Sequence, residues 1–166
     1  ELKLDPQNAQ DYIDRGVTYA EMGKFQESIP DFTQAIKLDP SNAKAYFNRG
    51  LSNEMLGKYT DALPDYTQAI KLDPNNAVKV LQHAYGQRAF IYYMLDDDTQ
   101  AISDWTQFIK LDPNSTDAYT GRGVSNENLG KYTDALSDFD HALRLDSSNE
   151  FARSGKARVS KILGYE

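Results

Sequence analysis

Residues 43–76 read AKAYFNRGLSNEMLGKYTDALPDYTQAIKLDPNN, and this stretch of 34 residues decides the fold. Its first part places apolar and small residues at the i, i+3, i+4, i+7, i+8 spacing of one helix face: Ala43, Tyr46, Phe47, Gly50 and Leu51. After a break at Gly57, a second apolar stripe follows and ends in a turn at Pro74. The stretch therefore predicts two amphipathic helices joined by a short turn.

The same unit recurs along the chain. A Leu-Asp-Pro motif ends at Pro6, Pro40, Pro74 and Pro113, and a degraded copy ends at Ser147. The spacings are 34 residues except between Pro74 and Pro113, where five extra residues raise the spacing to 39. One two-helix hairpin cannot bury its apolar stripe alone, so equivalent units are expected to stack side by side.

These units resemble the tetratricopeptide repeat family. The family pattern is an aromatic residue, x2, Leu-Gly, x2, Tyr, then Ala-x3-Phe, then Pro, and the resemblance covers essentially the whole chain. The third unit, for example, matches at the following places: Tyr85, Tyr92, Ala101, Trp105 and Pro113. The resemblance implies an all-α fold, a right-handed α-solenoid superhelix of antiparallel helix pairs, with the first helices lining the concave face.

The repeat register predicts six segments. Residues 1–8 are expected to be the end of a preceding repeat. Residues 9–42, 43–76, 77–115 and 116–149 form four repeats, the third with the insertion. Residues 150–166 are expected to form a C-terminal capping helix or a truncated fifth repeat.

Two departures from the family pattern carry predictions. The Leu before Gly is replaced by Arg15, Arg49, Arg88 and Arg122, and an Asp follows each Arg by sixteen residues. This spacing predicts an Arg–Asp pair within each hairpin. The alternative is an arginine row that contacts an acidic ligand. In the third unit, the insertion is expected to lengthen the first helix by about one and a half turns, or else to form a bent loop. The run Asp96-Asp97-Asp98 stands there in place of the turn glycine and the aromatic residue, and Asp tolerates the left-handed conformation.

The composition and motifs point away from catalysis and nucleic acid. The net charge is −7, whereas nucleic-acid binding usually needs a basic face. No apolar run is long enough for a membrane span. Cysteine is absent, which excludes disulfides and thiolate metal ligands. The two histidines, His83 and His141, lie in different repeats without a metal partner at ligand spacing. We therefore expect no enzyme activity, metal or cofactor; the compartment stays open, with the cytoplasm favoured.

The resemblance implies that a peptide or partner protein binds in the concave groove. Transferring the family's contact places by register gives these candidate groove residues: Ile13, Val17, Lys44, Phe47, Asn48, Leu51, Glu54, His83, Gln87, Phe90, Tyr93, Val124 and Glu127. Some of them could pack between repeats instead. Because the set is largely apolar with interspersed acids, it favours an apolar or amphipathic partner segment with some positive charge.

One family subtype grips the C-terminal carboxylate of heat-shock chaperones with Lys, Asn and Arg. Only Asn48 matches that pattern, so we predict that the chain is not a carboxylate clamp. Two other functions remain open at this point: self-association through exposed repeat ends, and service as the targeting arm of a larger enzyme.

Overall fold

A computed structural model of the protein describes residues 8–72 and 78–165, with the backbone alone for residues 78–81. These described residues form nine α-helices and no strand. The helices are α1 (Ala9–Glu21), α2 (Phe25–Leu38), α3 (Ala43–Met55), α4 (Tyr59–Leu72), α5 (Val78–Met94), α6 (Asp98–Leu111), α7 (Thr116–Asn128), α8 (Tyr132–Leu145) and α9 (Glu150–Leu163). The predicted all-α solenoid of antiparallel helix pairs is confirmed.

Short polar signals set the helix ends. Asn8, Asn42, Ser115 and Asn149 each accept a hydrogen bond from the backbone N–H three residues later, which satisfies an otherwise unpaired amide of the first turn. Each is the residue directly before the first helix of a pair, or before α9. The repeated sequence therefore restarts a helix at the same place in each of these units.

The turn within each hairpin needs a left-handed residue. Glycine supplies it at Gly23, Gly57 and Gly130, where φ is +73°, +72° and +71°. In the third hairpin Asp96 takes this place with φ +59°, and Asp97 caps α6 by accepting from the Gln100 amide. The expectation that an Asp of this run supplies the left-handed conformation is confirmed, and the structure identifies it as Asp96.

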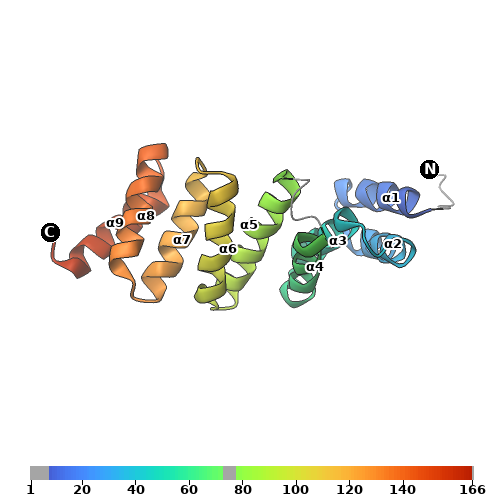
Figure 1. Ribbon diagram of the computed structural model, residues 1–166, viewed down its shortest axis with the longest axis horizontal. Helices are drawn as coiled ribbons and strands as arrows, with labels where there is room; N and C mark the ends of the chain where they lie inside the picture. Colours follow the sequence, from blue (N-terminus) through green and yellow to red (C-terminus); the bar gives the residue numbers. More distant parts are fainter. Residues whose placement is uncertain (1–7, 73–77, 166) are drawn as a thin grey trace. The chain divides into compact units, whose positions relative to one another are not determined.

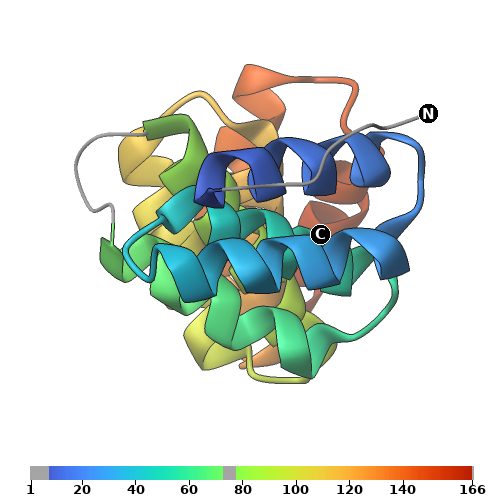
Figure 2. The ribbon, with the colours of Figure 1, turned by 90° about the vertical axis from the view of Figure 1, so that its right-hand side faces the viewer.

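The chain divides into two compact units, Glu1–Ala84 and Tyr85–Glu166. In the first unit α1 packs on α2, α2 on α3, and α3 on α4, as the two views show for α1 and α2 (Figures 1 and 2). Ile13, Ala35 and Ala45 form a fully buried cluster there. Small alanines let neighbouring helices approach closely, which is how the stacked hairpins share one core.

In the second unit α6 packs on α7, α7 on α8, and α8 on α9 (Figure 1). Its core is built around Phe139, which is fully buried among residues of α7, α8 and α9: Tyr119, Ala135, Ala142, Ala152 and Val159. One face of α9 is buried, whereas Phe151 and Ile162 are 80% and 54% exposed. The assignment of α9 as a cap or as the start of a fifth repeat remains a prediction.

The inserted residues lengthen the first helix of the third pair. Helix α5 has 17 residues, whereas α1, α3 and α7 have 13. The extension is therefore about one turn, somewhat less than predicted, and the bent-loop alternative is wrong for residues 78–81. The remainder of the predicted insertion, residues 75–77, lies outside the described residues.

Candidate functional site

Each hairpin contains the predicted Arg–Asp pair. In all four, the Arg donates from Nε and Nη2 to both oxygens of the Asp sixteen residues later, with distances between 2.6 and 3.0 Å. The guanidinium also lies over a tyrosine ring of its own helix, as Arg122 does over Tyr119 at 5.6 Å. The hydrogen bonds that Arg122 donates to Asp138 raise the pKa of Arg122. The arginines therefore link helices within hairpins, and the prediction of paired arginines is confirmed.

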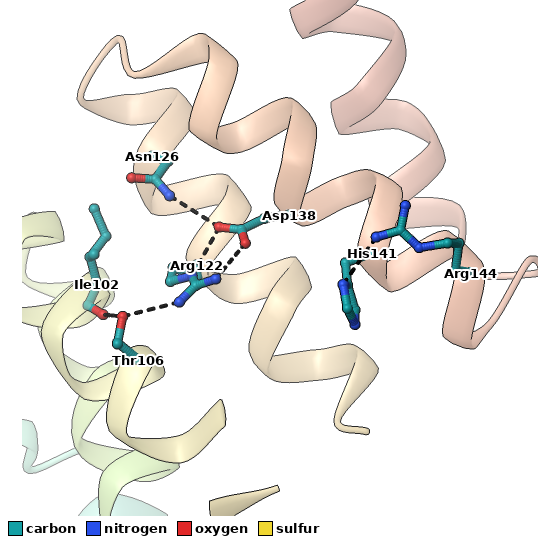
Figure 3. A network of polar contacts seen from close by, with 7 residues as sticks. All are labelled: Ile102, Thr106, Arg122, Asn126, Asp138, His141 and Arg144. Atoms are coloured by element: carbon teal, nitrogen blue, oxygen red, sulfur yellow. Dashed lines mark hydrogen bonds and ion pairs between the residues drawn. The ribbon is translucent and has the colours of Figure 1, made fainter. Parts of the chain in front are cut away.

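Two of these arginines, Arg49 and Arg122, also reach the preceding hairpin. Arg122 Nη1 donates to Thr106 Oγ1 at 3.2 Å, and Thr106 donates in turn to the Ile102 carbonyl (Figure 3). Asn126 adds a donor to Asp138 at 3.1 Å. In the first unit Arg49 makes the matching contact with Thr33 at 3.2 Å. This network fixes the relation of one hairpin to the next within each unit.

The candidate groove residues of the first unit differ in their access to solvent. Ile13 is fully buried against Ala35 and Ala45, so its side chain fills the core and offers no surface to a partner. Placing Ile13 in the groove was therefore a mistake in transferring the register. Val17, Asn48 and Leu51 are half-buried, and Lys44 is exposed.

Aromatic side chains gather beside these residues. The half-buried Phe47 ring lies 5.7 Å from the ring of Tyr66 and 6.3 Å from that of His83, between centroids. The Tyr66 hydroxyl donates to Glu54 Oε2 at 2.6 Å. Burial raises the pKa of the Glu54 carboxyl, although this hydrogen bond lowers it. The exposed His83 and half-buried Phe47 therefore present an apolar surface next to an acid.

In the second unit three predicted residues come together. Phe90, Tyr93 and Val124 line a cavity of about 220 Å³ with Trp105, Gly121 and Phe151, and its walls are almost wholly apolar. Phe90 and Tyr93 are 39% and 37% exposed. Gln87 is half-buried and lies outside this lining.

Sequence reasoning missed half of this cavity. Trp105, Gly121 and Phe151 were not among the candidate groove residues. The signal for Trp105 was Gly121: a Cβ there would lie 2.6 Å from the indole Cε2, so only glycine lets the ring rest against α7. Glu127 is also engaged, because Arg158 of α9 donates to both its oxygens at 2.8 Å.

A larger cavity in the first unit is of another kind. It measures about 630 Å³ and is bordered by α2, α3 and α4, lined by Arg49, Lys58, Asp65 and other polar groups. A smaller counterpart of about 320 Å³, lined by Arg122, Lys131 and Asp138, lies in the second unit. Because Asp65 and Asp138 hold them, Arg49 and Arg122 do not offer a free guanidinium to a ligand in these cavities.

The histidines and acidic side chains are the groups that could bind a metal ion. Among the residues that the structure describes, no three His, Asp or Glu side chains converge as a metal site. The His141 ring stacks on Tyr119, with ring centroids 4.0 Å apart. His141 also shares a hydrogen bond with Arg144 (Figure 3). No described helix is both long and apolar enough to cross a membrane.

Comparison with known proteins identifies the architecture. A family model described as tetratricopeptide repeat matches residues 13–77 and 97–150. No curated protein sequence matches the chain. Among solved structures, YrrB, described as a TPR protein with an unusual peptide-binding site, has a TM-score of 0.86 at 19% identity, over 95% of this chain and 78% of YrrB.

Two further structures share more sequence. MamA protein has a TM-score of 0.78 at 27% identity, over 88% of this chain and 77% of that chain. The first TPR of Spaghetti (RPAP3), bound to the HSP90 peptide SRMEEVD, has a TM-score of 0.66 at 28% identity, over 74% of this chain and 93% of that chain.

Proposed function

Because the chain belongs to the tetratricopeptide repeat family, we propose that it is a non-catalytic scaffold that binds a peptide or a partner protein on the first helices of its repeats. Two structurally similar proteins support this assignment, since YrrB is described as having a peptide-binding site and the Spaghetti repeat domain is bound to a peptide. The observation that carries it is the apolar cavity bordered by Phe90, Tyr93 and Val124, which lies on first helices and is open to solvent.

The binding residues are those candidate groove residues that retain exposed or half-buried side chains. They are Val17, Lys44, Phe47, Asn48, Leu51, Glu54, His83, Gln87, Phe90, Tyr93, Val124 and Glu127. Aromatic groups in such a set supply most of the binding free energy, because they bury large areas with few rotatable bonds. Glu54 steers a partner with positive charge toward the surface, whereas the charge of Glu127 is met by Arg158.

The partner segment is apolar or amphipathic and is not a chaperone C-terminal carboxylate. At the places of the clamp, Ile13 is buried and Val17 is apolar, so neither supplies a polar hydrogen to a carboxylate. His83 and Gln87 stand where the clamp has Lys and Arg. The C-terminal carboxylate of a chaperone would approach a chain of net charge −7. The residues at the clamp places would not supply the guanidinium and ammonium donors that bind such a carboxylate.

The test compares capture of binding proteins by the wild-type chain and by Phe90→Asp. We expect Phe90→Asp to lose the partner while its helical circular dichroism is retained, because a carboxylate would be buried in an apolar contact. Leu145→Asp is the matched control, since Leu145 is 37% exposed and lies on the second helix α8. Capture of the same partner at unchanged yield by Phe90→Asp would show that the first-helix face is not the binding surface.

A further inference from the structure

We propose that the cavity of the second unit is an anchor pocket, which takes one bulky apolar side chain of the partner, Leu, Met or Phe, with a Lys or Arg next to it. This inference rests on the proposed function and specifies the chemistry of the partner. The anchor pocket is formed by Phe90, Tyr93, Trp105, Gly121, Val124 and Phe151.

The size of the anchor pocket selects a single side chain. Sites for small-molecule ligands span roughly 300–1,000 Å³, and an apolar cavity of about 150 Å³ already holds a benzene ring. The anchor pocket, at about 220 Å³, lies between these limits. It therefore suits one aromatic or branched side chain and is too small for a cofactor.

The residues around the anchor pocket leave it open. Phe151 is 80% exposed, and Phe90 is 39% exposed. Trp105 lies against Gly121, where a Cβ would come within 2.6 Å of the indole ring. A partner side chain between these groups would remove several aromatic surfaces from water together, which favours binding in proportion to the apolar area buried.

The charge beside the anchor pocket selects a basic neighbour. A second hollow of about 310 Å³ shares Val124 and Phe151 with it and is bordered by Glu150 and Arg158. Arg158 is neutralised, since it donates to both oxygens of Glu127 at 2.8 Å and to Ser154 at 3.0 Å. Glu150, exposed in the first turn of α9, has no partner among the described residues. Among the charged residues that border this hollow, Glu150 is therefore the unpaired one, and its carboxylate favours a cation there.

The experiment uses the full chain and synthetic peptides of about a dozen residues, selected on it from a random library and free of tryptophan. Trp105 is the only tryptophan, so its emission reports on the anchor pocket directly. Selected peptides are expected to share a bulky apolar residue beside Lys or Arg and to shift this emission. Replacing the bulky residue by Ala is expected to weaken binding about tenfold.

Variants of the protein test the two parts separately. Phe151→Ala, at a largely exposed position that folding does not require, is expected to weaken binding severalfold. Glu150→Lys is expected to reverse the preference, so that a Glu beside the anchor binds better than a Lys. Glu27→Lys, an exposed acid on α2, is the matched control and is expected to leave the preference unchanged.

The outcomes separate this inference from the proposed function. In one outcome, selected peptides bind without shifting Trp105 emission and with the same affinity for Phe151→Ala as for wild type. If Phe47→Asp nevertheless abolishes their binding, the anchor pocket is overturned while the first-helix face remains the binding surface. If Glu150→Lys leaves the preference for Lys or Arg beside the anchor residue unchanged, the inferred basic neighbour is wrong. A selection without binders, or emission that shifts with protein concentration alone because a second copy fills the anchor pocket, would contradict the inference as well.

Discussion

Arg122 of α7 donates to Asp138 of α8 through two hydrogen bonds, from Nε to Oδ2 at 3.0 Å and from Nη2 to Oδ1 at 2.7 Å (Figure 3). The Asp138 side chain is 7% exposed and that of Arg122 is 22% exposed. Such a pair stabilises the fold chiefly because removing one member leaves the other buried and unpaired.

Asp138→Ala is therefore expected to lower the free energy of unfolding by about 2–4 kcal/mol, since Arg122 and Asn126 both lose an acceptor. Urea titration followed by circular dichroism measures the change. Asp140→Ala is the control, because Asp140 is 37% exposed and pairs with the half-exposed Lys156; it is expected to change stability by less than about 1 kcal/mol. Combining Asp138→Leu with Arg122→Leu should cost much less than Asp138→Ala, since no charge stays buried. An equal loss of stability in Asp138→Ala and in the double variant would contradict the pairing argument.

Stability should also depend on the ionisation of Glu54. Burial raises the pKa of Glu54 from its ordinary 4.5 in the folded chain, so the folded state favours the protonated carboxyl. The stabilisation from this group is complete below 4.5 and is lost as the pH rises through the folded pKa.

Glu54→Gln keeps an acceptor for the Tyr66 hydroxyl and removes the buried charge. We expect the variant to be more stable than wild type at pH 7, by less than about 1 kcal/mol, and equal to it at pH 3. Thermal unfolding at the two pH values decides this. A higher unfolding temperature for wild type than for Glu54→Gln at pH 7 would show that the hydrogen bond from Tyr66 outweighs the cost of burying the Glu54 charge.

Helix α9 docks through Gly155. A Cβ at this position would lie within 2.7 Å of Phe139 Cε2, in the centre of the second unit's core. Gly155→Val is therefore expected to push α9 off α8 and to cost about 1–3 kcal/mol of stability, as overpacked cores do. Ala157→Val, exposed on the same helix, controls for helix propensity and should cost only a few tenths of a kcal/mol. Similar losses in both variants would mean that α9 contributes no close packing.

The peptide SRMEEVD tests the exclusion of the carboxylate clamp. We expect no binding of the labelled peptide in fluorescence anisotropy, because Ile13 is buried and Val17 is apolar at the clamp places. The first TPR of Spaghetti, which is bound to this peptide in its structure, serves as the positive control. Binding comparable to that control would overturn the exclusion.

Much of the fold could be predicted because its determinants repeat. The sixteen-residue spacing of Arg49 and Asp65 implied a contact that the structure contains, and Asp96 could replace glycine since only φ mattered at that turn. Ile13 was misplaced because its core contacts, Ala35 and Ala45, come from the next two helices, and register alone does not state how deeply a helix face is covered.

The anchor pocket was harder to predict for a related reason. One of its lining residues, Phe151, comes from α9, a helix without the signature aromatic of the other first helices. The docking of α9 depends on the absence of a side chain at Gly155, and Arg158 finds Glu127 across 31 residues of sequence. The Gly155–Phe139 contact repeats the Gly121–Trp105 contact 34 residues later, whereas the Glu127–Arg158 pair has no counterpart in the repeat and could not be predicted from it.

The most direct test of the account is a map of amide chemical-shift changes when a captured partner peptide is added to the isotope-labelled chain. We predict that the largest changes fall on the first helices α1, α3, α5 and α7 and around Phe151. Changes concentrated instead on the second helices α2, α4, α6 and α8 would contradict it.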